Sequence, residues 1–117
     1  MTIKGIQDWL GLQVQVIMDR PMGSRHPQYG FVYPVNYGHL QDFLGGDGEE
    51  QDAYVLGVDQ ALIAFEGIVA AVILREDDQE DKLVVTPPDV LLTREEIAAA
   101  VAFQEQYFKS RVFLPGD

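Results

Sequence analysis

Residues 62–75 read LIAFEGIVAAVILR, a run of Val, Ile, Leu and Phe that predicts a β-strand. Gly67 interrupts this run and predicts a bend or a β-bulge there. Leu12–Met18 alternates apolar and polar side chains, which is the pattern of a half-buried strand. Three further short strands are predicted at Phe31–Val35, Ala53–Val58 and Leu83–Thr86. Because Gly, Pro and Asp separate these strands and no helices alternate with them before residue 93, the pattern predicts a small β-barrel.

Only the C-terminal region has a helical pattern. Thr93 and Glu96 have the spacing of a capping box, which marks the start of a helix. Apolar side chains then recur near helical spacing at Ile97, Val101, Phe108 and Val112. We therefore expect a helix from about Arg94 to about Ser110. The predicted fold class is mainly β with a C-terminal helix (α+β).

Length and charge exclude several classes of function. The 117 residues suit one domain, expected over residues 1–117, and the chain contains no cysteine for disulfides or thiolate metal sites. The formal net charge of −11 argues against sequence-independent binding to nucleic acid or to an anionic membrane, because both need Lys and Arg. No apolar run reaches the ~20 residues of a membrane span. We expect a cytoplasmic protein.

Two acidic segments carry the candidate chemistry: residues 47–52 (DGEEQD), which run into a predicted strand, and residues 76–81 (EDDQED), which lie between two strands. If the barrel brings both segments together, at least four carboxylates meet, and their repulsion requires bound cations. Carboxylate oxygens favour Mg²⁺, Mn²⁺ or Ca²⁺. The alternative is that each segment is simply solvated. An EF-hand loop starting at Asp47 is excluded, since it would place Asp52 where glycine is needed and Val58 where glutamate is needed.

Three ordered motifs, YPVNYG at 33–38, DGEEQD at 47–52 and EDKLVVTP at 80–87, resemble those of the soluble family I inorganic pyrophosphatases. The family pattern is YPxNYG, DGDPxD and DxK, and the resemblance covers roughly residues 14–109. It implies a small five-stranded barrel of the oligonucleotide-binding (OB) type. It also implies Mg²⁺-dependent hydrolysis of inorganic pyrophosphate to two orthophosphates by a metal-activated water, with Mn²⁺ as an alternative cofactor. Pyrophosphate or another small phosphoanhydride is the expected partner, and a homo-oligomer remains open.

The resemblance also assigns roles to individual positions. Glu49 would orient or deprotonate the attacking water as the catalytic residue. The implied metal ligands are Asp47, Asp52, Asp77 and Asp81, with Asp78 and Glu80 competing for the last two places. The implied substrate-binding residues are Arg25, Tyr37, Lys82, Tyr107 and Lys109.

The sequence departs from the family pattern in several places, and two of the departures bear directly on activity. Glu49 replaces an aspartate, which moves the carboxylate by about one methylene, and a misplacement on the order of 1 Å can lower the rate ~10²-fold. The segment between Met18 and Tyr33 is shorter than in full-length relatives and lacks a secure counterpart of their phosphate-binding lysine. A second hypothesis is therefore a catalytically silent protein that binds metal or phosphate or acts through interactions. A third is hydrolysis of a different phosphoanhydride.

Overall fold

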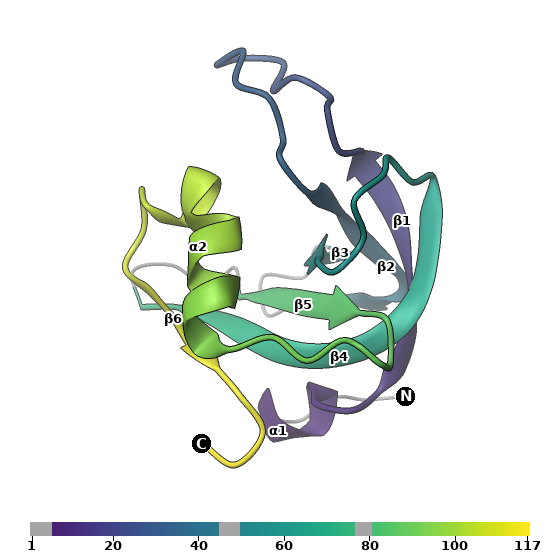
Figure 1. Cartoon of the computed structure of the whole chain (residues 1–117), viewed down its shortest axis with the longest axis vertical. Helices are drawn as coiled ribbons and strands as arrows, with labels where there is room; N and C mark the ends of the chain where they lie inside the picture. Colours follow the sequence, from purple (N-terminus) through teal and green to yellow (C-terminus); the bar gives the residue numbers. More distant parts are fainter. Residues whose placement is uncertain (1–5, 45–49, 77–80) are drawn as a thin grey trace.

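The fold is a closed five-stranded β-barrel with a sixth strand at its edge and a helix against its side (Figure 1). The computed structural model describes residues 6–44, 50–76 and 81–117. Its strands are β1 (Gln13–Arg20), β2 (Asn36–Leu44), β3 (Glu50–Val55), β4 (Ala64–Arg75), β5 (Lys82–Thr86) and β6 (Ser110–Phe113). Its helices are α1 (Ile6–Trp9) and α2 (Arg94–Glu105). This confirms the predicted mainly-β fold with a C-terminal helix and a five-stranded barrel of the OB type.

The strands pair in the order β1-β2-β3-β5-β4-β6, and the pairing of β1 with β4 closes the barrel. Among the described strands, β3 and β5 form the one parallel pair. The two acidic segments directly precede or include the first residues of β3 and β5. Because the strands run in the same direction, the described residues next to both segments lie at the same end of the barrel.

The long strand β4 gives the barrel its curvature (Figure 1). Its first half pairs with β1 and its second half with β5 and β6. The irregularity in its pairing lies between Val69 and Ala71, a few residues after the predicted position at Gly67. Gly67 is required for a different reason: a Cβ atom there would lie 2.6 Å from the backbone oxygen of Thr86 and would overlap the Phe65 ring.

The core has two parts because the barrel strands bury both faces. Inside the barrel, Leu83 and Val85 of β5 join a cluster with Val16 and Leu40. Val84, which points to the opposite face, belongs to a second cluster with Tyr54 and Ile73 of the barrel and with Ile97 and Val101 of α2. The side chains of β5 thus alternate between the barrel interior and the layer under the helix.

The helix begins as predicted but ends earlier. Thr93 caps it: the Glu96 N–H donates to the Thr93 hydroxyl at 3.1 Å, and the Thr93 N–H donates to the Glu96 carboxylate at 2.9 Å. The helix ends at Glu105, so the predicted end near Ser110 is wrong. Val112 is buried as a residue of β6 opposite Ile73, and its match to the helical spacing is coincidental.

Two strand predictions also need correction. Phe31–Val35 forms no strand and contributes only an isolated bridge between Val32 and Arg25. The strand starts later, at Asn36, where the side-chain amide is fully buried and binds the backbone of Met22, Gln60 and Leu62. The prediction for Ala53–Val58 is displaced as well, because β3 runs from Glu50 to Val55. In the described part of the chain, no helix has the length and apolar character to cross a membrane.

Candidate active site

One residue from each of the three sequence motifs meets at the carboxylate of Asp52. The Tyr37 hydroxyl donates a hydrogen bond to Oδ2 of Asp52 at 3.0 Å, and Nζ of Lys82 lies 2.6 Å from the same oxygen. The barrel register explains this meeting. His39 of β2 lies opposite Asp52, so Tyr37 is two residues away on the same face, while Ala53 pairs with Leu83 and places Asp52 beside Lys82.

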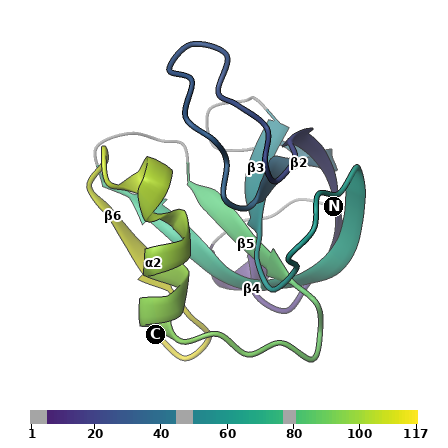
Figure 2. The same cartoon turned by 45° about the horizontal axis from the view of Figure 1, so that its top comes forward.

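These residues line a cavity of about 760 Å³. Its walls come from barrel strands, from the long loop between β1 and β2, and from the segment after α2, which rise at the same end of the molecule (Figures 1 and 2). The described lining residues are His26, Tyr29, Phe31, Tyr37, Asp52, Arg75, Lys82, Gln104, Tyr107 and Phe108. The predicted site residues Tyr37, Asp52, Lys82 and Tyr107 therefore share one cavity.

Burial keeps Tyr37, one of the tyrosines that line this cavity, in its protonated form. Burial, and then the negative charge of Asp52, raise the pKa of Tyr37 far above its usual range. Tyr37 therefore keeps its proton at neutral pH and acts as a hydrogen-bond donor. Burial, followed by the charge of Glu105, raises the pKa of Tyr54 in the same way. Neither phenol is suited to serve as a base.

A buried ion pair lies beside Asp52 and Lys82, and the sequence did not predict it. Nε and Nη2 of Arg75 donate to the two carboxylate oxygens of Glu105 at 3.1 and 2.7 Å, and the two side chains are only 3% and 5% exposed. The Tyr54 hydroxyl also donates to Glu105 at 2.6 Å and accepts from Gln104 at 2.8 Å. The guanidinium of Arg75 lies 3.7 Å from the centre of the Phe108 ring.

A sequence signal for this pair did exist. Glu105 follows Ile97 and Val101 at intervals of four residues, so it lies on the apolar face of α2. A carboxylate on a buried helix face needs a cationic or hydrogen-bonding partner. Arg75 ends the apolar run of β4 and is the partner that the structure shows.

The remaining predicted residues lie in different places. Asp81 directly precedes β5: its Oδ1 accepts from the Arg75 N–H at 3.1 Å, and its backbone oxygen accepts from Gln51 at 2.7 Å. This bond joins the described flanks of the two acidic segments. Arg25 bonds the backbone oxygen of Gly30 at 3.0 Å, and neither it nor the exposed Lys109 lines the cavity. Asp47, Glu49, Asp77, Asp78 and Glu80 lie outside the described residues, so their roles remain predictions.

The donor chemistry around Asp52 suits a hard cation. The Asp52 side chain is 32% exposed at the cavity wall, and Mg²⁺ is commonly held by one or two carboxylates together with waters and substrate phosphates. Over residues 6–44, 50–76 and 81–117, no group of three or more His, Asp or Glu side chains has the arrangement of a complete metal site. A full set of protein ligands would therefore need the predicted carboxylates outside those ranges.

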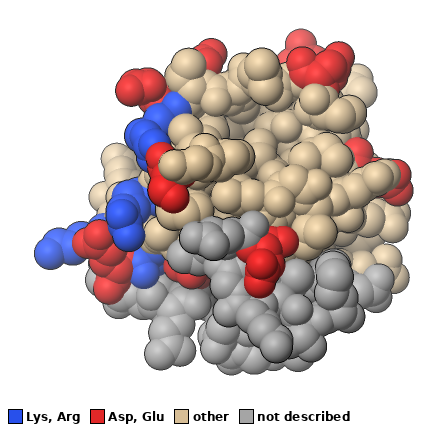
Figure 3. Space-filling model, turned by 90° about the horizontal axis from the view of Figure 1, so that it is seen from below, with Lys and Arg blue, Asp and Glu red and all other residues tan. Residues whose placement is uncertain are grey.

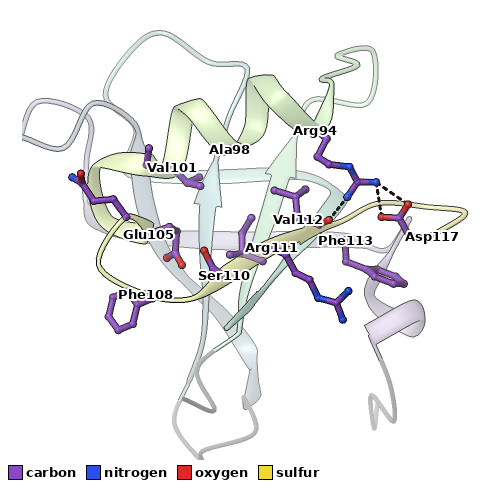
Figure 4. A pocket seen from close by; sticks show the side chains of 13 residues that line it. Arg94, Ala98, Val101, Glu105, Phe108, Ser110, Arg111, Val112, Phe113 and Asp117 are labelled. Atoms are coloured by element: carbon purple, nitrogen blue, oxygen red, sulfur yellow. Dashed lines mark hydrogen bonds and ion pairs between the residues drawn. The ribbon is translucent and has the colours of Figure 1, made fainter. Parts of the chain in front are cut away.

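A second cavity, of about 660 Å³, lies between α2 and β6 (Figure 4). Its described lining mixes apolar side chains with polar and charged ones, and none of the predicted site residues is among them. At one end Arg94 binds the Asp117 carboxylate at 2.8 Å and the backbone oxygen of Val112. In the view from below, Lys and Arg side chains gather at one side with acidic side chains beside them (Figure 3). The cavity beside Asp52 is the better candidate because it contains the motif residues.

Comparisons with known proteins agree with this fold. No protein-family model matches the sequence, and no curated protein matches it. Solved structures do match, all at low sequence identity. The inorganic pyrophosphatase of Ehrlichia chaffeensis superposes with a TM-score of 0.70 at 14% identity, covering 90% of this chain and 87% of that one. The inorganic pyrophosphatase of Helicobacter pylori superposes with a TM-score of 0.62 at 21% identity, covering 99% of this chain and 88% of that one.

A third solved structure, an inorganic pyrophosphatase from Neisseria gonorrhoeae, has a TM-score of 0.57 at 23% identity and covers 77% of this chain and 70% of that one. The chain therefore has the fold of solved inorganic pyrophosphatases, as the three motifs predicted. At these identities the likeness concerns the fold, and the chemistry has to be argued from the residues of the site.

Proposed function

We propose that the chain is a divergent family I inorganic pyrophosphatase that hydrolyses pyrophosphate to two orthophosphates with Mg²⁺. The observation that carries this proposal is the convergence of Tyr37, Asp52 and Lys82, each from a different motif, on one carboxylate oxygen in one cavity. The order of the three motifs in the sequence and the meeting of one residue from each in the cavity both fit this function. The pyrophosphatase fold of the solved relatives supports the same conclusion.

Asp52 would hold the metal together with Asp47, Asp77 and Asp81. When bound, Mg²⁺ would neutralise charge on the phosphates and lower the pKa of a coordinated water. Mn²⁺ prefers the same oxygen donors and is expected to substitute. Lys82 donates to the Asp52 oxygen and so holds the carboxylate in one orientation at the cavity wall.

The other residues would bind and orient the substrate. Tyr37 keeps its proton, so its single O–H, which donates to Asp52 in this structure, would donate to a phosphoryl oxygen once substrate is bound. Lys82 adds a positive charge beside the same position, and Tyr107 contributes a further hydroxyl from the segment after α2. Glu49 would orient the water that attacks one phosphorus as the bridging oxygen leaves with the other phosphate. Arg25 and Lys109 stay predicted phosphate ligands.

The test is phosphate release from pyrophosphate by the purified chain, with Mg²⁺ and with a chelator. Release should require Mg²⁺ and should be abolished in Asp52→Asn, which removes the charge while keeping the size of the side chain. Asp89→Asn is the matched control, since Asp89 is exposed in the turn after β5 and away from the cavity. Equal release by the wild type and Asp52→Asn would refute the assignment.

The same assay separates the proposal from the catalytically silent alternative. A specific observation favours keeping that alternative: Oδ2 of Asp52, the proposed metal ligand, is already paired with Lys82 at 2.6 Å. A silent binding protein would take up Mg²⁺ or a phosphate compound in a calorimetric titration and release no phosphate. An active enzyme would release phosphate at substoichiometric protein concentration.

A further inference from the structure

The cavity beside Asp52 has an aromatic wall in which His26, Tyr29 and Phe31 have no role in the proposed hydrolysis of pyrophosphate. The rings form a continuous series from the cavity mouth inward. Tyr29 stacks on His26 with 4.8 Å between ring centres, and His26 lies 4.9 Å from Phe31. Phe31 lies 5.3 Å from Tyr33, and Tyr33 stacks at 5.9 Å on Tyr37, which binds Asp52.

The loop that carries these rings is held in place by its own hydrogen bonds. The backbone of Gly23 donates to Tyr33, and the backbone of Tyr33 donates to Ser24, both at 2.8 Å. Nδ1 of His26 accepts from the backbone N–H groups of Gln28 and Tyr29 at 3.1 Å, which fixes the imidazole ring. The aromatic wall is therefore built before any ligand arrives, so little ordering entropy is lost on binding.

The outermost ring of this wall is not part of the core. The Tyr29 side chain is 75% exposed although it lines the cavity, and Tyr107, which enters the same cavity from the segment after α2, is 74% exposed. At this exposure the two rings bury little area within the fold, so most of their surface is available to a ligand in the cavity. They are suited to stack with the flat face of a ligand, since every nucleobase offers such a face.

The cavity is also larger than a pyrophosphate ion needs. Its volume of about 760 Å³ lies within the range of roughly 300–1,000 Å³ typical of sites for drug-sized ligands. Polar and charged groups lie at Tyr37, Asp52 and Lys82, whereas His26, Tyr29, Phe31 and Tyr107 provide the aromatic part. The cavity thus offers two adjoining surfaces, one for phosphate and one for a planar ring.

We propose that this site also accepts a nucleoside diphosphate or triphosphate, whose base stacks on the aromatic wall at Tyr29 while its phosphoanhydride lies beside Asp52 and Lys82. This inference rests on the proposed phosphohydrolase function and extends its substrate class from pyrophosphate to nucleotides. The reaction balances as a hydrolysis: water adds to the terminal phosphorus, the phosphoanhydride bond breaks, and orthophosphate and the shortened nucleotide leave. No oxidant, reductant or second substrate is needed.

The test uses two ligands with a non-hydrolysable methylene bridge in Mg²⁺ buffer, so that binding is measured without turnover. One is α,β-methylene-ADP, and the other is methylenediphosphonate, which lacks the nucleoside. Calorimetric titration gives the ratio of their dissociation constants. The nucleotide should bind roughly tenfold more tightly or better, because stacking of one base on an aromatic side chain is typically worth about that much or more. Tyr29→Ala should bring the ratio close to one.

Two control variants test whether the effect on nucleotide binding comes from the aromatic ring of Tyr29. Tyr29→Phe keeps the stacking face and should retain the wild-type ratio. Leu91→Ala truncates a side chain that is 94% exposed outside the cavity and should also retain it. Thermal unfolding of each variant checks that the fold persists. A wild-type ratio near one, no binding of either ligand, or an unchanged ratio in Tyr29→Ala would overturn the inference.

Failure of the inference and failure of the proposed function give different results. If the chain releases phosphate from pyrophosphate but the two dissociation constants are nearly equal, the pyrophosphatase proposal holds and the nucleotide proposal is refuted. Binding of the nucleotide ligand that depends on Tyr29, without phosphate release from pyrophosphate or from ADP, would support the ring site and refute hydrolysis.

Discussion

The buried ion pair between Arg75 and Glu105 gives the sharpest prediction on stability. Glu105→Gln keeps the size of the side chain and one oxygen acceptor, but it removes the negative charge from beside an arginine that is 3% exposed. Removing one partner of a buried pair typically destabilises a protein by about 3–5 kcal/mol. We expect about 3 kcal/mol, the lower end, because the glutamine can still accept the hydrogen bond from Tyr54.

This loss should lower the melting temperature by roughly 12 °C, taking about 4 °C per kcal/mol for a chain of this size. The free energy of unfolding can be measured by urea denaturation followed by circular dichroism, and the slope of the transition should stay constant. The double variant Arg75→Gln with Glu105→Gln should lose considerably less stability than the sum of the losses in the two single variants. Each single variant already loses the interaction between the two side chains, so the second change cannot remove it again.

The matched control is Glu76→Gln. Glu76 and Arg111 form a pair at 3.8 Å whose side chains are 59% and 68% exposed, and exposed pairs contribute about 0–1 kcal/mol. If Glu105→Gln loses no more stability than Glu76→Gln, or if the two single changes in the buried pair add without coupling, the role given to this pair is refuted.

Three further predictions concern the fold around the site. The hydrogen bond from His39 to Asp19 raises the pKa of His39, and the other ring nitrogen lies 2.8 Å from Glu50. The stabilisation by charged His39 should therefore be complete below its unfolded pKa of about 6.5. It should disappear as the pH rises through the higher pKa of the folded state. Urea melts of wild type and His39→Gln should therefore differ most at low pH and converge at alkaline pH; parallel curves would contradict this. Thr93→Ala should lose about 1 kcal/mol by the same assay with the barrel retained, since it removes the helix cap, and an unchanged midpoint would count against the capping box. Gly38→Ala should lose roughly 1–3 kcal/mol, because its Cβ would overlap the backbone carbonyl of Ile17; a neutral result would mean that β1 and β2 separate easily.

The sequence predicts the strands whose burial follows a simple pattern and fails where another constraint acts. Alternation identifies β1, which buries alternate residues in its first half, and the dense apolar runs identify β4, which is mostly buried in its second half, and β5, which is buried at every residue. It misses β2, which reads NYGHLQDFL. Asn36 is buried because its side chain binds the backbone of loops, and Gly38 is needed because the backbone of β1 passes close to it. Neither residue contributes to an apolar pattern.

The candidate site was predicted in part by the order of the motifs. Tyr37, Asp52 and Lys82 were each assigned by resemblance, and the structure brings them into contact. Arg75 and Glu105 were missed because a single charge at the end of a strand and another on a helix face have no fixed spacing in the sequence. Their pairing depends on how α2 packs on β4, which only the tertiary structure defines.

The parallel pairing of β3 with β5 is what connects the barrel to the proposed chemistry. In an antiparallel pair, the start of one strand lies beside the end of the other, which would separate Asp52 from Lys82 by the length of the strand. Here the register of Ala53 with Leu83 places the two starts together, and Gln51 binds the backbone of Asp81 across them at 2.7 Å. Asp52 and Asp81, the described ends of the two acidic segments, therefore lie at the same end of the barrel. The proposed metal site depends on this register, so a variant that broke the β3–β5 pairing is expected to lose Mg²⁺ binding and phosphate release together.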